Sequence, residues 1–147
     1  MIFEFKAKDV YNGKWIYGDL TRTTNNPETI SSYKINNKLV NLNTISMYLN
    51  HNDKFNRKIF NYDIINVNNK TNYLIFYNNE QCAFSLLILD KISINEYKNK
   101  LNCLTILPGK NWWNENKYNI EIIGNLFDNI NLLNGLTYDD VIKLNYS

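Results

Sequence analysis

Residues 44–67 read TISMYLNHNDKFNRKIFNYDIINV and join a polar segment to a short apolar one. The first part, NHNDKFNRK at 50–58, has no periodic apolar pattern, so we interpret it as a surface turn. The second part, DIINV at 63–67, is rich in β-branched residues and predicts a strand. The stretch therefore indicates β-structure with a polar connection.

The same pattern of short apolar runs and polar turns extends in both directions. Strands are predicted at 2–9, 14–20, 72–77, 81–90 and 120–125. Turns are predicted at Asn12-Gly13, Asn36-Asn37 and Asn78-Asn79, and polar loops at 21–32 and 108–117. Helical turns are predicted at 94–101, and after Thr137, which forms a capping box with Asp140. Strands outnumber helices throughout.

These elements define the expected fold class. At 147 residues the chain has the length of one domain, and we expect residues 1–147 to form it. A hydrophobic fraction of 44% and an aromatic fraction of 14% are typical of a folded protein. We predict a strand-rich α+β domain with a compact β-barrel-like or sheet core and short helices.

Charge and cysteine content exclude several classes of protein. A formal net charge of +2, with acids and bases mixed, makes duplex DNA an unlikely ligand. The chain has no run of about 18 apolar residues and no signal-peptide plan, so we expect a cytoplasmic protein without a membrane partner. Cys82 and Cys103 are too few for a disulfide framework, and we expect both to be reduced and buried.

Motifs for catalysis are missing from the sequence. His51 is the single histidine, and its polar surroundings favour a solvated loop histidine over a catalytic one. One histidine and two distant cysteines cannot complete a zinc shell without help from carboxylates. Neither GxxxxGK nor GxGxxG occurs. We therefore predict a non-enzymatic protein with no catalytic residue, metal or cofactor.

Two segments carry candidate binding residues. The first is the 50–58 segment, in which cationic residues and aromatic residues are neighbours in the sequence. This combination suits the binding of phosphate oxygens and bases. The candidate residues are His51, Lys54, Phe55, Arg57 and Lys58. The alternative is a solvated charged loop. The second segment contains Trp112 and Trp113, of which one could enter the core while the other forms an interface. The alternative there is two core tryptophans.

Three blocks of the sequence resemble the YopX family of phage and prophage proteins. FKAKD at 5–9 and KWIYG at 14–18 are similar to the family's opening strand pair. EIIGNLFDNINLL at 121–133 is similar to its closing block. The central block aligns without a gap to 44–67, with matches at Thr44, Ile45, Tyr48, Asp53, Lys54, Ile59, Phe60, Asp63, Ile64, Ile65 and Val67.

Four family glycines of the central block are replaced here. They are Ser46, Asn50, Asn56 and Tyr62. Asparagine tolerates a positive φ, whereas tyrosine is strained there, so we expect the turn at 61–63 to differ in shape from the family's. The resemblance implies a β-rich, self-associating phage domain and says little about activity.

Two functional hypotheses follow from the resemblance and from the missing catalytic motifs. The first is a binding protein that a phage uses against its host, either by occupying a host defence protein or by sequestering a small nucleotide signal. The second is a structural or regulatory phage oligomer that contacts nucleic acid. We favour the first hypothesis, and under both we expect a homo-oligomer.

Overall fold

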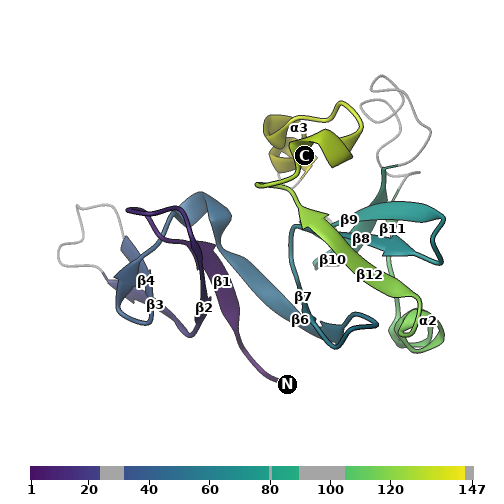
Figure 1. Ribbon diagram of the computed structural model, residues 1–147, viewed down its shortest axis with the longest axis horizontal. Helices are drawn as coiled ribbons and strands as arrows, with labels where there is room; N and C mark the ends of the chain where they lie inside the picture. The colour runs from purple at the N-terminus through teal and green to yellow at the C-terminus, as the bar shows by residue number, and fades with distance from the viewer. Residues whose placement is uncertain (24–31, 80, 90–104, 145–147) are drawn as a thin grey trace. The chain divides into compact units, whose positions relative to one another are not determined.

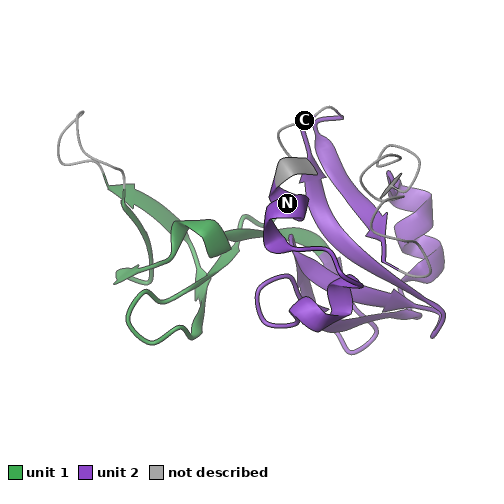
Figure 2. Ribbon diagram, turned by 90° about the horizontal axis from the view of Figure 1, so that it is seen from above, with its two compact units in different colours: residues 1–50 green, residues 51–147 purple. Residues whose placement is uncertain are grey.

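The computed structural model describes residues 1–23, 32–79, 81–89 and 105–144 (Figure 1). The chain divides into two compact units, residues 1–50 and 51–147 (Figure 2). Each unit is strand-rich, and the predicted α+β class is confirmed. A single domain over residues 1–147 stays a prediction. No helix among the described residues is long and apolar enough to span a membrane.

Unit 1 consists of short antiparallel strands. They are β1 (Phe5–Lys8), β2 (Trp15–Gly18), β3 (Leu20–Thr23), β4 (Ser32–Ile35), β5 (Lys38–Leu39) and β6 (Ser46–Asn52), with the 3₁₀ turn η1 (Leu42–Thr44) before β6. The last two residues of β6 belong to unit 2. β1 pairs with both β2 and β6, and β4 pairs with both β3 and β5. A small core of Ala7, Ile35 and Val40 lies between these strands.

The hairpin turns of unit 1 lie where the sequence predicts them. Gly13 has a φ of 70°, and its N–H donates to the Asp9 carbonyl oxygen at 2.9 Å. Asn36 and Asn37 have φ values of 49° and 61° between β4 and β5. Two consecutive positive φ values are those of the primed turns that match the twist of a hairpin. The prediction of a loop at 21–32 is wrong at both ends, because β3 extends to Thr23 and β4 begins at Ser32. Residues 24–31 lie outside the described residues.

Unit 2 contains a five-stranded antiparallel sheet in the order β11-β10-β9-β8-β12. Its strands are β8 (Asp63–Val67), β9 (Thr71–Asn78), β10 (Ala83–Ile88), β11 (Thr105–Ile106) and β12 (Ile120–Asn125), and β7 (Lys58–Phe60) precedes them. Ile64, Leu74 and Leu87 lie opposite one another on neighbouring strands and are fully buried. This row of side chains forms the centre of the core of unit 2.

The C-terminal segment covers one face of this sheet. After β12 come η3 (Ile130–Leu133) and α3 (Tyr138–Leu144), which lie over the sheet in Figure 1. Leu133, Leu136 and Val141 pack into the core from this side. The predicted capping box begins α3, since the Thr137 N–H donates to Asp140 Oδ2 at 3.0 Å and the Asp140 N–H donates to Thr137 Oγ1 at 3.2 Å.

Two local predictions in unit 2 are wrong. Residues 110–116 form helix α2 (Lys110–Asn116) in place of the predicted polar loop. Cys82 is exposed instead of buried, because it lies in the turn before β10. Tyr62 has a φ of 69°, and a difference of the turn at 61–63 from the family's stays a prediction. The predicted helical turns at 94–101 and Cys103 lie outside the described residues.

Candidate functional site

Asp53 organises the turn between β6 and β7; we call this turn, together with Lys58 at the start of β7, the 53–58 turn. Its carboxylate is buried, and Oδ1 accepts hydrogen bonds from the N–H groups of Phe55, at 3.0 Å, and Arg57, at 2.9 Å. The Asn56 N–H donates to the Asp53 carbonyl oxygen at 2.9 Å, and Asn56 has a φ of 62°. An acidic side chain that bonds the backbone ahead of it is a common way to fix a tight turn. The segment is therefore held in one conformation.

Arg57 connects this carboxylate to β12. Arg57 Nε and Nη2 lie 2.9 and 2.7 Å from Asp53 Oδ2. Nη2 also donates to the Ile122 carbonyl oxygen at 3.0 Å, and the Ile122 N–H donates to Asp53 Oδ2 at 3.2 Å. Arg57, which the sequence indicates as a candidate binding residue, thus makes these guanidinium contacts inside the chain.

These contacts set the protonation state of Asp53. Burial by itself raises the pKa of this carboxyl group. The hydrogen bonds from Arg57 and from the Ile122 N–H, with the charge of Arg57, outweigh burial and lower the pKa below its ordinary value. Asp53 is therefore an anion at neutral pH.

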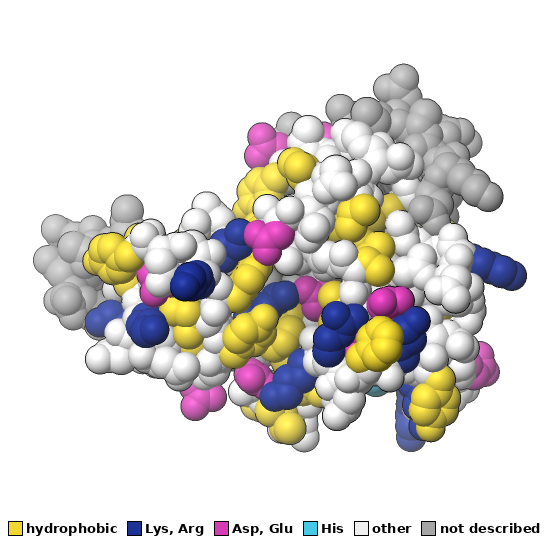
Figure 3. Space-filling model, viewed as in Figure 1, with side chains coloured by type: hydrophobic (Ala, Val, Ile, Leu, Met, Phe, Trp, Pro, Cys, Tyr) yellow, Lys and Arg dark blue, Asp and Glu magenta, His cyan; other side chains and the backbone are white. Residues whose placement is uncertain are grey.

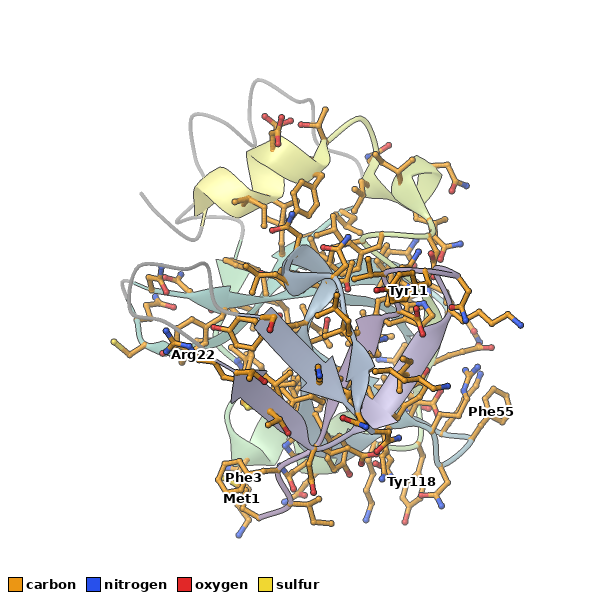
Figure 4. The ribbon with its side chains drawn as sticks, turned by 90° about the vertical axis from the view of Figure 1, so that its left-hand side faces the viewer. Met1, Phe3, Tyr11, Arg22, Phe55 and Tyr118 are labelled. Carbon is orange, nitrogen blue, oxygen red and sulfur yellow. The ribbon has the colours of Figure 1, made fainter. Side chains whose placement is uncertain are left out.

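Phe55 projects from this fixed turn with 62% of its surface exposed. Lys54 Nζ lies 5.1 Å from the centre of its ring, and Arg57 Cζ lies 5.3 Å from it. Lys54 is held in turn by Glu121, whose Oε2 is 3.0 Å from Nζ. Figure 4 shows the labelled Phe55 side chain pointing outward. The result is an exposed aromatic ring beside two positioned cations.

The other predicted residues of this segment take different places. Lys58 is the first residue of β7 and is exposed. His51 belongs to β6, is half-buried, and stacks on Trp113 with ring centres 4.3 Å apart and ring planes at 7°. The prediction of a solvated loop histidine is therefore wrong. Burial lowers the pKa of His51, so the ring is neutral at pH 7 and adds no charge to the turn.

The two tryptophans lie in α2 and differ in burial. Trp113 is buried under His51, and its indole meets that of Trp112 edge-on at 5.0 Å. Trp112 is half-buried and meets Tyr73 edge-on at 6.4 Å. Trp113 is thus a core tryptophan and Trp112 is a half-buried one, and an interface role of Trp112 stays a prediction. The rings of His51, Trp113, Trp112 and Tyr73 form one continuous contact.

The sequence-predicted binding residues thus separate into two groups. Lys54, Phe55 and Arg57 form one exposed cluster, whereas His51 and Trp113 pack against each other. Sequence reasoning missed Asp53 and Glu121, which hold the two cations of the turn. For Asp53 a signal existed, since an aspartate before a short polar segment is typical of a turn fixed by its side chain.

The space-filling view shows where apolar and cationic side chains lie together on the surface. In Figure 3, hydrophobic side chains lie next to Lys and Arg side chains in the lower right part of the molecule.

Among the described residues, no group of three or more His, Cys, Asp or Glu side chains is arranged to hold a metal ion. In comparisons with known proteins, the sequence matches no family model and no curated protein.

Proposed function

We propose that the chain is a non-enzymatic binding protein that attaches to a partner protein through the 53–58 turn. One observation carries this proposal: Phe55 is 62% exposed, while the backbone beneath it is fixed by the buried Asp53. A ring that is already oriented loses little conformational freedom on binding. Transfer of such a ring into an apolar pocket contributes about 1.5–3 kcal/mol.

The pairing of the cations favours a protein over a nucleotide as the partner. Lys54 already has Glu121 as its ion-pair partner, and Arg57 has Asp53. A phosphate would have to compete with these carboxylates. A partner protein gains most of its affinity by burying the Phe55 ring, so it does not have to displace these carboxylates. We therefore rank occupation of a protein above sequestration of a nucleotide signal.

The biological setting that we propose is a phage or prophage protein that occupies a defence protein in the host cytoplasm. The resemblance of three sequence blocks to phage proteins motivates this setting. The backbone agrees with this resemblance at three of the four replaced glycines, because Asn50, Asn56 and Tyr62 have φ values of 61°, 62° and 69°. A left-handed backbone at these positions explains why glycine would be used there.

The test is recovery of bound material with the full chain and two variants. Tagged chains are purified from infected host cells, and the material is analysed by native and denaturing mass spectrometry. We expect one host polypeptide with the unchanged chain and about tenfold less with Phe55→Ala. Tyr11→Ala is the matched control, since Tyr11 is 85% exposed but belongs to unit 1.

Each other result contradicts the proposal. A nucleotide released by denaturation supports the sequestration hypothesis. A bound oligonucleotide supports the regulatory phage oligomer that contacts nucleic acid. If the unchanged chain and Phe55→Ala recover equal amounts of polypeptide, the 53–58 turn is not part of the binding surface.

A further inference from the structure

A second exposed aromatic residue with its own cation lies between α2 and β12. Tyr118 is 75% exposed, and Lys117 Nζ lies 4.8 Å from the centre of its ring. Single exposed aromatic residues are common on protein surfaces and need no explanation. Two of them, each with cations at its ring and both in unit 2, form a pattern that a binding surface explains.

The backbone brings this pair close to the 53–58 turn. The Lys54 N–H donates to the Ile120 carbonyl oxygen at 2.8 Å, and Ile120 is two residues from Tyr118. With about 3.8 Å between consecutive Cα atoms and about 5 Å across a paired strand, the Cα atoms of Phe55 and Tyr118 are at most about 16 Å apart. In Figure 4 both labelled side chains lie at the same edge of the molecule.

The charges of this surface complement an acidic partner. Lys54 pairs with Glu121, Arg57 pairs with Asp53, and Lys117 lies over the Tyr118 ring. Asp53 is buried, so the accessible groups among these are three cations and the carboxylate of Glu121. Complementary charge at the edge of an interface guides association and selects the partner, while aromatic rings provide most of the affinity.

From this arrangement we infer that Tyr118 and Lys117 form a second binding point of the same surface. The partner is a polypeptide that offers apolar side chains to both rings and carboxylates to the cations around them. This inference rests on the proposed protein-binding function and deepens it by stating the partner's chemistry. It also extends the surface to two residues that the sequence motifs do not indicate.

The inference is tested with two defined probes and the full chain. The first probe is a fluorescent peptide of about 14 residues that alternates Glu and Leu, and the second is a fluorescent oligothymidylate of about equal length. Fluorescence anisotropy at about 0.15 M salt measures both affinities. We expect tighter binding of the peptide, and at least fivefold weaker peptide binding, roughly 1 kcal/mol, for Tyr118→Ala and for Phe55→Ala.

Controls separate loss of binding from loss of fold. Tyr118→Phe should retain peptide binding, because it keeps the ring. Tyr11→Ala should bind like the unchanged chain, since this equally exposed ring lies in unit 1. Thermal unfolding followed by circular dichroism should be unaltered in Tyr118→Ala, because Tyr118 is 75% exposed.

The results distinguish this inference from the proposed function. If Phe55→Ala weakens peptide binding and Tyr118→Ala does not, the second binding point is wrong and the 53–58 turn remains. If the oligothymidylate binds more tightly than the peptide, the partner's chemistry is wrong. If neither substitution alters peptide binding, or if the peptide does not bind, both the second binding point and the proposed function are overturned.

Discussion

Arg57 is a candidate binding residue in the sequence, but in the structure it stabilises the chain's own turn. Its guanidinium group contacts Asp53 and the Ile122 carbonyl oxygen, so it joins the turn to β12. Without Arg57 the buried carboxylate of Asp53 loses its cation, so replacement of Arg57 should weaken the fold.

We predict that Arg57→Ala lowers the free energy of unfolding by about 1–3 kcal/mol. This range is below that for a fully buried pair because the Arg57 side chain is 51% exposed. Urea unfolding followed by tryptophan fluorescence measures the loss. Lys58→Ala is the matched control, since Lys58 is an exposed cation next to Arg57 and should cost less than about 0.5 kcal/mol. Equal losses in the two variants would contradict this role of Arg57.

The same carboxylate makes stability depend on acid pH. The pKa of Asp53 is lowered in the folded chain from its ordinary value of 3.8. Its stabilising contribution is therefore complete above about pH 5 and is lost as the pH falls below 3.8 through the folded pKa. We predict that the stability difference between the unchanged chain and Asp53→Asn shrinks between about pH 5 and pH 2.5. A difference independent of pH in urea unfolding would exclude this contribution.

At the scale of elements, β12 requires Gly124 at the point where its pairing with β8 shifts register. The register between β12 and β8 shifts between Ile122 and Gly124. A Cβ atom on Gly124 would lie 2.5 Å from Asn129 Oδ1, which accepts a hydrogen bond from the Asn125 N–H at 3.1 Å. Asn129 cannot turn aside without loss of that bond, so the position has no room for a side chain.

We predict that Gly124→Val lowers the free energy of unfolding by about 1–3 kcal/mol, because the added atoms overpack this contact. Thermal unfolding followed by circular dichroism measures the change. Gly109→Ala is the control, since a Cβ atom there meets nothing within 4 Å. A melting temperature of Gly124→Val equal to that of the unchanged chain would mean that Asn129 moves without cost.

Helix α2 shows how contacts distant in sequence select an element. Its sequence, KNWWNEN, is rich in asparagine, a weak helix former, and it spans only seven residues. Short helices derive most of their stability from tertiary packing. Here Trp113 packs beneath His51, and Asn116 Nδ2 donates to the Trp112 carbonyl oxygen at 2.9 Å. These contacts provide what the local sequence lacks.

At the scale of the whole molecule, we predict a homo-oligomer. Apolar side chains of unit 1 are exposed, among them Met1 at 96%, Ile2 at 59% and Phe3 at 66%. Burial of such side chains and of open strand edges favours self-association. Light scattering at about 50 µM should give a mass of at least twice 17.4 kDa. A monomer at this concentration would contradict the prediction.

The sequence by itself determined the strand-rich class and most local elements. β8, β9, β10 and β12 lie at predicted apolar runs, and the turns at Asn12-Gly13 and Asn36-Asn37 and the capping box lie where short motifs indicate them. These features depend on residues within a few positions of one another. Their preferences are therefore readable without knowledge of the rest of the fold.

The tertiary structure decided the helical state of α2, the conformation of Tyr62 and the roles of the candidate site residues. Tyr62 holds a φ of 69° because its N–H donates to the Ile75 carbonyl oxygen and its own carbonyl oxygen accepts from Leu126. His51 meets Trp113, and Arg57 meets Ile122, across more than sixty residues of chain. Such pairings arise only when strands and helices pack, because no local pattern records which distant side chain will be the neighbour.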